Sequence, residues 1–223
     1  MEARERRTKW GDRIARERDI RESALALLEA NGYQALSMRA VAEGAQVSLG
    51  TLYTYFASKE ELYATLYAQR LGQLAEEFEI ACAAVTSIED ALVAIAETYF
   101  EVHRVFGREL DLWAVDGLAA GISDEVVAEL MKSALRVHGT AAAAMARLEP
   151  AFAVMSEEKR LAAVQLVWIT VIGLAEHFHG ARAFLYQGSQ RKLIEQAAEV
   201  LVAGFRAVLL EPLAVPPQDG SGH

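Results

Sequence analysis

The chain has little of several patterns that define other protein classes. Its single cysteine, Cys82, excludes an intramolecular disulfide framework and a thiolate metal cage, and we expect it to be a small residue within a helix. The longest apolar stretch, residues 161–175, has 15 residues, whereas a membrane-spanning helix needs about 20. The charged N-terminal sequence does not fit a secretory signal. We therefore expect a cytoplasmic protein with no membrane partner.

Motifs of catalysis and metal binding are also missing. The chain has no glycine-rich phosphate loop, no nucleophile elbow and no HExxH zinc motif. The pair His177 and His179 invites a metal site, but residues two apart on a helix point about 200° away from each other. The sequence thus predicts no enzyme, no cofactor and no metal ligands.

Positive charge is scarce overall, and the formal net charge of −9 argues against nucleic acid when taken alone. The distribution removes most of this objection, because residues 1–59 carry ten Lys and Arg against eight Asp and Glu, a net of +2. The basic residues are densest at the start of the chain, at Arg4, Arg6, Arg7, Lys9, Arg13, Arg16, Arg18 and Arg21. We expect residues 1–17 to be a flexible basic arm, which either follows DNA phosphates or is a solvated tail.

Apolar residues recur at helical spacing throughout, with no strand-like alternation, which predicts an all-α fold. The first helix spans residues 19–30 and ends at Asn31-Gly32, a good C-terminal cap. Further helices are predicted over residues 60–85, 87–107, 109–118, 124–147, 157–179 and 190–210. Residues 212–223 contain three prolines and two glycines, so we expect a disordered tail.

The most informative segment is residues 37–62, SMRAVAEGAQVSLGTLYTYFASKEEL. Ser37 and Ser48 are each placed to cap a short helix, and a tight turn separates the two. Ser58 with Glu61 has the spacing of a capping box at the start of a third helix. Small, hydroxylated or flat side chains cover the outer face of the second short helix, which suits a major groove about 12 Å wide. This layout predicts a helix-turn-helix that reads DNA.

The run from Val47 to Leu62 resembles the DNA-binding domain of the TetR family of bacterial transcriptional regulators. The resemblance implies a three-helix helix-turn-helix domain over residues 18–66 and a helical ligand-binding and dimerisation domain over residues 67–211. It also implies the following DNA contacts: Ser37, Arg39, Ser48, Leu49, Gly50, Thr51, Tyr53, Tyr55 and Lys59. Arg39, Tyr53, Tyr55 and Lys59 are expected to hold phosphates, whereas Leu49, Gly50 and Thr51 approach base edges.

Two departures from the family pattern affect this prediction. Gln46 stands in the turn where the family commonly has glycine, so we expect the turn to be shifted onto Gly44. Leu49 is apolar where many relatives are polar or basic, so it cannot pair with guanine, although it can contact a thymine methyl group.

The last two long predicted helices are apolar on more than one face, which requires more than one neighbour. The resemblance implies that they form a four-helix bundle in a homodimer, and the alternative is that both lie in the core of a monomer. The middle helices are then expected to hold a small apolar or aromatic effector. The candidate ligand-binding residues are Tyr99, His103, Phe106, Trp113, Trp168 and Ile172.

These observations together predict a ligand-responsive transcriptional regulator, most simply a repressor that a small-molecule effector releases from a palindromic, double-stranded DNA operator. The alternative is a helical carrier or sensor of small molecules that does not act through DNA. That alternative leaves the arrangement of Tyr53, Tyr55 and Lys59 without a role.

Overall fold

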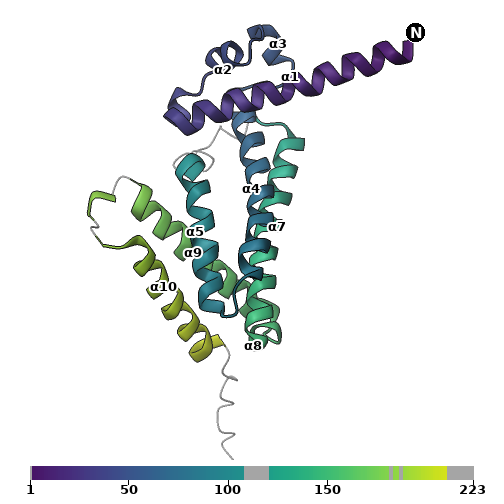
Figure 1. Ribbon diagram of the computed structural model, residues 1–223. Helices are drawn as coiled ribbons and strands as arrows, with labels where there is room; N and C mark the ends of the chain where they lie inside the picture. The colour runs from purple at the N-terminus through teal and green to yellow at the C-terminus, as the bar shows by residue number, and fades with distance from the viewer. Residues whose placement is uncertain (1, 108–120, 181–182, 186–187, 210–223) are drawn as a thin grey trace, which may run out of the picture.

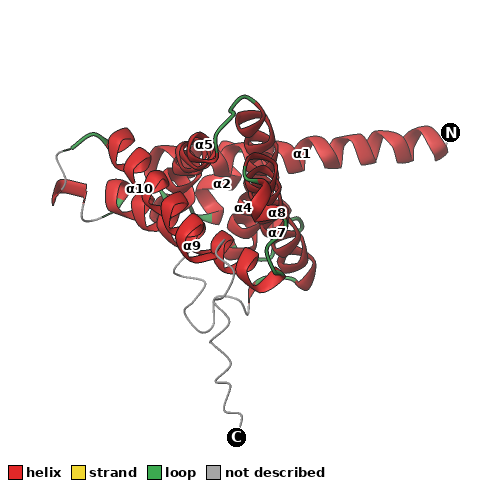
Figure 2. Ribbon diagram, turned by 90° about the horizontal axis from the view of Figure 1, so that it is seen from below, coloured by secondary structure: helices red, strands yellow, loops and turns green. Residues whose placement is uncertain are grey.

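The computed structural model describes residues 2–107, 121–180, 183–185 and 188–209 and, for residues 2–12 and 208–209, the backbone alone. Every regular element in these ranges is helical, which confirms the predicted all-α class (Figure 2). The predicted helix over residues 109–118, the candidate ligand residue Trp113 and the predicted tail over residues 212–223 lie outside the described residues.

Three helices form one end of the molecule (Figure 1). They are α1 (Glu2–Asn31), α2 (Met38–Gly44) and α3 (Leu49–Tyr53), and a short 3-10 turn, η1 (Tyr33–Ala35), links the first two. Apolar side chains from each helix meet in a common core, among them Ile20, Val41 and Leu52, none of which has any exposed surface. The three-helix domain predicted from the sequence is therefore present.

The start of α1 differs from the predicted flexible arm over residues 1–17, because the backbone is helical from Glu2 onward. This stretch contains no proline, and arginine, alanine and glutamate are good helix formers. Ion pairs four residues apart, Arg21 with Glu17 and Arg18 with Glu22, support the helix further along. Figure 1 shows the N-terminal part of α1 projecting beyond the rest of the molecule.

Helix α4 (Lys59–Ala83) leads from this end into the remaining helices. It packs along α7 (Asp124–Leu148) and also against α5 (Ile88–Val102), which continues as a π-helical turn, η2 (His103–Gly107). Serine caps fix the starts of α4 and α5, since Ser58 and Ser87 each accept a backbone N–H three residues ahead. Cys82 is buried in α4, as predicted, and its carbonyl accepts a hydrogen bond of 2.6 Å from Arg147.

A short helix, α8 (Pro150–Ala153), turns the chain into α9 (Glu157–His179), whose bounds are those predicted. After a 3-10 turn, η5 (Ala183–Leu185), α10 (Gln190–Gly204) packs against α5 and α9 and ends in a π-helical turn, η6 (Phe205–Leu209). Ion pairs of 2.9 Å, Arg191 with Glu97 and Arg206 with Glu89, tie its two ends to α5.

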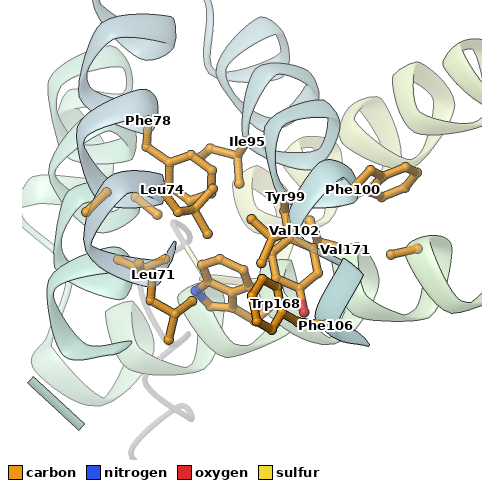
Figure 3. Close-up of a cluster of buried hydrophobic side chains, with 14 of the residues drawn as sticks. Leu71, Leu74, Phe78, Ile95, Tyr99, Phe100, Val102, Phe106, Trp168 and Val171 are labelled. Atoms are coloured by element: carbon orange, nitrogen blue, oxygen red, sulfur yellow. The ribbon is translucent and has the colours of Figure 1, made fainter. Parts of the chain in front are cut away.

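Helix α9 has two apolar faces. The inner face, which includes Val167, Trp168 and Val171, is buried (Figure 3). The outer face exposes four large aliphatic side chains: Leu161, Leu166, Ile169 and Ile172. By length and composition α9 is long and apolar enough to cross a membrane. We predicted no such segment from the sequence, because the uninterrupted apolar run has only 15 residues. The four side chains of the outer face are not covered by any described residue of the same chain.

Candidate DNA-binding site

The surface of α3 is the centre of the candidate site. Ser48 caps the helix by accepting the N–H of Thr51 at 3.0 Å, and its hydroxyl lies 2.8 Å from the hydroxyl of Thr51. Leu52 anchors the inner side, where it is fully buried. The opposite side, here called the recognition face, consists of Ser48, Leu49, Gly50 and Tyr53, all of them exposed. The short helix thus presents small and flat side chains to the solvent.

Gly50 has no packing role within the protein. A Cβ atom added there would meet only the Oγ of Ser48, at 3.9 Å, which is ordinary van der Waals contact. The fold therefore tolerates a side chain at this position, and any requirement for glycine comes from whatever approaches the recognition face.

The turn between α2 and α3 is not shifted onto Gly44, and that expectation was wrong. Gln46 itself adopts the left-handed conformation, with φ of 56°. The N–H of Gln46 bonds to the carbonyl of Glu43 and the N–H of Val47 to that of Ala42, which is the Schellman arrangement at a helix end. Gly44 belongs to α2 and has a different role, because a Cβ atom there would lie 2.3 Å from the Oγ of Ser23 on α1. One residue makes the turn and the other permits close helix packing.

Lys59 is already engaged inside the protein. Its Nζ donates to the carbonyl of Tyr33 at 2.8 Å and lies 3.7 Å from the centre of the Tyr33 ring. The lysine thus links the start of α4 to η1, although an ammonium group has three donors and only one is used in this bond. Next to Lys59, Ser58 accepts the N–H of Glu61, which is one half of the predicted capping box. In return the Glu61 carboxylate accepts the N–H of Ala57 at 2.7 Å, one residue before Ser58.

The remaining predicted contacts lie around α3. Ser37 caps α2 by accepting the N–H of Ala40 at 3.2 Å, and both Ser37 and Arg39 are exposed. Tyr55 is half-buried, and the guanidinium carbon of Arg13 lies 5.7 Å from the centre of its ring. Sequence reasoning missed Arg13 as a neighbour of Tyr55, because residues 1–17 were expected to be flexible. The extended α1 therefore brings one basic residue, Arg13, to the edge of the site.

The comparisons with known proteins agree with this geometry. The sequence model described as bacterial regulatory proteins, tetR family, matches residues 20–66, which span the second half of α1 through the first part of α4. Residues 20–66 of this chain thus match the DNA-binding domain of the TetR family.

One curated relative in this family is the HTH-type transcriptional repressor KstR of Rhodococcus jostii strain RHA1. It is 47% identical over 64 residues, which make up 29% of this chain and 27% of the relative. The chain thus matches about a quarter of the length of that relative, and the match is informative for the DNA-binding domain.

Solved structures extend the likeness to the whole fold. The regulator FadR from Bacillus subtilis, in complex with stearoyl-CoA, aligns with a TM-score of 0.62 and 17% identity over 84% of this chain and 98% of that one. FadR from Thermus thermophilus, a TetR-family repressor in complex with lauroyl-CoA, aligns with a TM-score of 0.59 and 16% identity, covering 90% and 98% of the two chains. At these identities the likeness concerns the fold. The relatives named here are transcriptional regulators.

The described candidate ligand residues fall into two groups. Tyr99, His103, Phe106 and Trp168 are all buried, and the rings of Tyr99 and Trp168 meet edge to face at 5.5 Å (Figure 3). Ile172 instead lies on the outer face of α9 and is 45% exposed. It does not join the aromatic cluster because the adjacent Val171 occupies the inner position.

The aromatic cluster contains polar atoms in an apolar environment. Burial raises the pKa of Tyr99 to about 12, so its phenol remains a neutral hydrogen-bond donor at physiological pH. The Nε1 atom of Trp168 is buried without a hydrogen-bond partner among the described residues. His103 Nε2 lies 3.4 Å from a carboxylate oxygen of Glu176 on α9. The cluster therefore combines apolar side chains with a few buried polar atoms.

The cavities lined by described residues lie mainly elsewhere. One of about 310 Å³ opens between α1 and α4 and includes Phe106, together with arginines that sequence reasoning did not select, Arg21 and Arg70. Arg21 pairs with Glu17 four residues earlier, a pattern that is typical of a solvated helix face. The sequence therefore gave no indication that Arg21 lines a cavity. Among the described residues no group of three or more His, Cys, Asp or Glu side chains is placed to hold a metal ion.

Proposed function

We propose that this protein is a cytoplasmic transcriptional repressor that binds a two-fold symmetric DNA operator as a homodimer and leaves it when a small-molecule effector binds. In this proposal residues 18–66 read DNA, and residues 67–211 bind the effector and dimerise. The observation that carries the proposal is the recognition face, where Leu49, Gly50 and Tyr53 are exposed on a helix whose other side is fully buried.

The proposed DNA contacts divide by chemistry. Leu49, Gly50 and Thr51 approach base edges, with the aliphatic side chain of Leu49 suited to a thymine methyl group. Phosphate contacts come from the surrounding polar groups, namely Ser37, Arg39, Ser48, Tyr53, Tyr55 and Lys59. Lys59 has an internal partner in Tyr33, so its phosphate contact requires either a second donor or release of that bond.

Dimerisation through α9 and α10 supplies the symmetry that a palindromic site requires. The outer face of α9 exposes Ile169 and Leu161, and Val200 on α10 is also exposed. Gly173 and Gly204 are exposed with no atom within 4 Å of an added Cβ, so the helices of a second subunit can approach closely there. A dimer places two recognition helices on one face of DNA, at half-sites about 34–36 Å apart or a multiple of that distance.

The effector is proposed to bind near Tyr99, His103, Phe106 and Trp168 and to have a long apolar portion. Two solved relatives of the same fold contain stearoyl-CoA and lauroyl-CoA, which favours acyl thioesters as the first class to test. The effector is proposed to bind better to the dimer whose two recognition helices are spaced wrongly for DNA. A coupling free energy of about 1–3 kcal/mol between effector binding and DNA binding weakens DNA affinity about 5- to 150-fold.

The test is selection of random duplex DNA on the purified protein, followed by titration of the selected site with acyl-CoA thioesters. Enrichment of a two-fold symmetric site, and its release by a thioester, is the expected result. Failure of the folded, effector-free protein to enrich any sequence would contradict the DNA-binding role and favour a helical small-molecule carrier.

A further inference from the structure

A cavity of about 310 Å³ lies where the DNA-binding end meets the rest of the protein, and we call it the junction cavity. Its apolar wall comes from three elements, with Ile14 and Leu25 on α1, Leu66 on α4 and Phe106 on η2. Its volume is within the range of small-molecule sites, at the lower end. The cavity therefore has room for a small ligand with an apolar body.

Two guanidinium groups on the wall of this cavity keep unused hydrogen-bond donors. The Nε of Arg21 and the Nη1 of Arg70 are buried, and neither has a hydrogen-bond partner among the described residues. Each arginine uses a different nitrogen for an ion pair, Arg21 with Glu17 and Arg70 with Glu77, the latter at 2.9 Å. These two nitrogens have almost no accessible surface, so an acceptor in the cavity reaches them only when the arginine side chains turn. A buried donor that lacks an acceptor is unfavourable, and such a turn toward a ligand acceptor is therefore stabilised.

Carboxylates also line the junction cavity, but each has an arginine partner. Glu17 pairs with Arg21, and Glu22 lies 3.6 Å from Arg18. Arg70 faces them from α4, and its partner Glu77 is not part of the wall and is 43% exposed. The charges on the wall thus leave one arginine in excess, and the two unused donors come from opposite helices.

We propose that the junction cavity binds an amphipathic anion. Its carboxylate or phosphate accepts hydrogen bonds from Arg21 on α1 and Arg70 on α4, and its apolar body packs on Leu25, Leu66 and Phe106. A charge-assisted bond to each helix makes the ligand a bridge between the DNA-binding end and α4. Binding itself is independent of the proposed function, whereas any effect on DNA affinity rests on it.

Phe106 connects this site to the interior of the protein. Its ring lies 5.5 Å from that of Tyr63 and 5.4 Å from that of Tyr67, and the Tyr63 hydroxyl donates to the Phe106 carbonyl at 2.7 Å. A second cavity of about 380 Å³, between α4 and α7, shares Arg21 and Gln69 with the first. A longer ligand can therefore extend past Arg21 along α4.

The test is titration calorimetry of the full-length protein, without DNA, using octanoate, 1-octanol and inorganic phosphate. These probes carry both the charge and the chain, the chain alone, and the charge alone. We expect octanoate to bind about tenfold or more tightly than either of the others, because only octanoate reaches both the arginines and the apolar wall. Equal affinity for octanoate and 1-octanol, or for octanoate and phosphate, would overturn the proposal.

Matched variants locate the site. Arg70→Gln should weaken octanoate binding about tenfold and leave 1-octanol unchanged, and Arg21→Gln should do the same. Glu77→Gln is the control, since it breaks the same ion pair as Arg70→Gln but keeps the guanidinium, and it should bind octanoate at least as tightly as the native protein. Loss of octanoate affinity in Glu77→Gln equal to that in Arg70→Gln would assign the effect to the ion pair and overturn the proposal.

The result is separable from the proposed function. If octanoate fails to bind while the protein still enriches a symmetric operator, only the junction site is wrong. If octanoate binds as described while no DNA is enriched, the junction site stands and the repressor role fails.

Discussion

The recognition face of α3 and the outer face of α9 both expose apolar side chains, yet they differ in chemistry. Leu49 and Tyr53 on α3 are 42% and 50% exposed, and they lie beside the hydroxyl of Ser48 and the bare backbone of Gly50. On α9, Ile169 is 67% exposed and is flanked by other large aliphatic residues of the same face. The first surface suits a polar groove with occasional methyl groups, and the second suits an apolar copy of itself. The comparison teaches that exposure alone does not identify a partner, because the neighbouring residues decide which kind of surface each face suits.

Ile169→Glu is expected to have the largest effect, because in the proposed dimer it buries two unpaired carboxylates, one per subunit. A buried charge without a partner costs about 3–5 kcal/mol, so the dimer dissociation constant should rise by more than about 100-fold. Sedimentation equilibrium measures this change directly.

Ile80→Glu is the control for the α9 variant. Ile80 is 74% exposed on α4, away from the outer face of α9, and its replacement should leave the dimer intact. If Ile169→Glu remains as dimeric as Ile80→Glu, the outer face of α9 is not the subunit interface.

Gly50→Ala tests the recognition face at the position that has no packing role. An added methyl group forces an offset from the groove floor at a cost of about 1–3 kcal/mol, so operator affinity should fall about 5- to 150-fold. Thermal unfolding should be unchanged or slightly higher, because alanine favours a helix. Gly139→Ala on α7, where an added Cβ meets no atom within 4 Å, should leave operator affinity unchanged and raise thermal stability for the same reason. Unaltered DNA binding in Gly50→Ala would exclude close approach at α3.

Lys59→Ala separates a phosphate contact from a structural one. A phosphate contact predicts weaker binding to all DNA sequences and a salt dependence whose log–log slope is smaller by about one. The bond to Tyr33 predicts in addition a loss of stability of about 1–2 kcal/mol. Measurements of DNA affinity at several salt concentrations, together with urea unfolding, distinguish the two. An unchanged slope with reduced stability would leave Lys59 with the structural role alone.

Gln46→Gly has the smallest expected effect. It changes the turn that joins α2 to α3, which carries the recognition face. Removal of the side chain from a left-handed backbone position should stabilise the protein by about 1 kcal/mol, with DNA affinity nearly unchanged. Gly44→Ala offers the contrast, since its methyl group displaces the Ser23 hydroxyl and should destabilise the protein. Chemical denaturation of both variants measures the difference, and a less stable Gln46→Gly protein would contradict this reading of the turn.

The sequence predicted the elements whose ends depend on local chemistry. Ser37, Ser48 and Ser58 all cap helices as expected, because a serine cap needs only the backbone three residues ahead. The bounds of α9 were also predictable, because apolar residues recur at helical spacing from Leu161 to Phe178, just inside both ends.

What the sequence could not predict depends on neighbours distant in the chain. Val171 and Ile172 are equally apolar, and only the packing of α5 against α9 decides which of them is buried. The left-handed turn falls on Gln46, whereas Gly44 stays helical and lies close to Ser23, a residue 21 positions earlier. Arg21 and Arg70 come together only when α1 crosses α4, so the junction cavity has no signature in sequence spacing.

Helix α4 has a mechanical consequence. Its 25 residues run without a break from Lys59 beside α3 to Ala83 at the far end, a rod of about 37 Å. If the far end is fixed, a tilt of only about 5° moves the near end by about 3 Å, which is the full length of a hydrogen bond. With such a tilt, repacking by less than 1 Å around Phe78 and Trp168 would be amplified along α4 into a displacement large enough to lift side chains out of reach of a rigid partner.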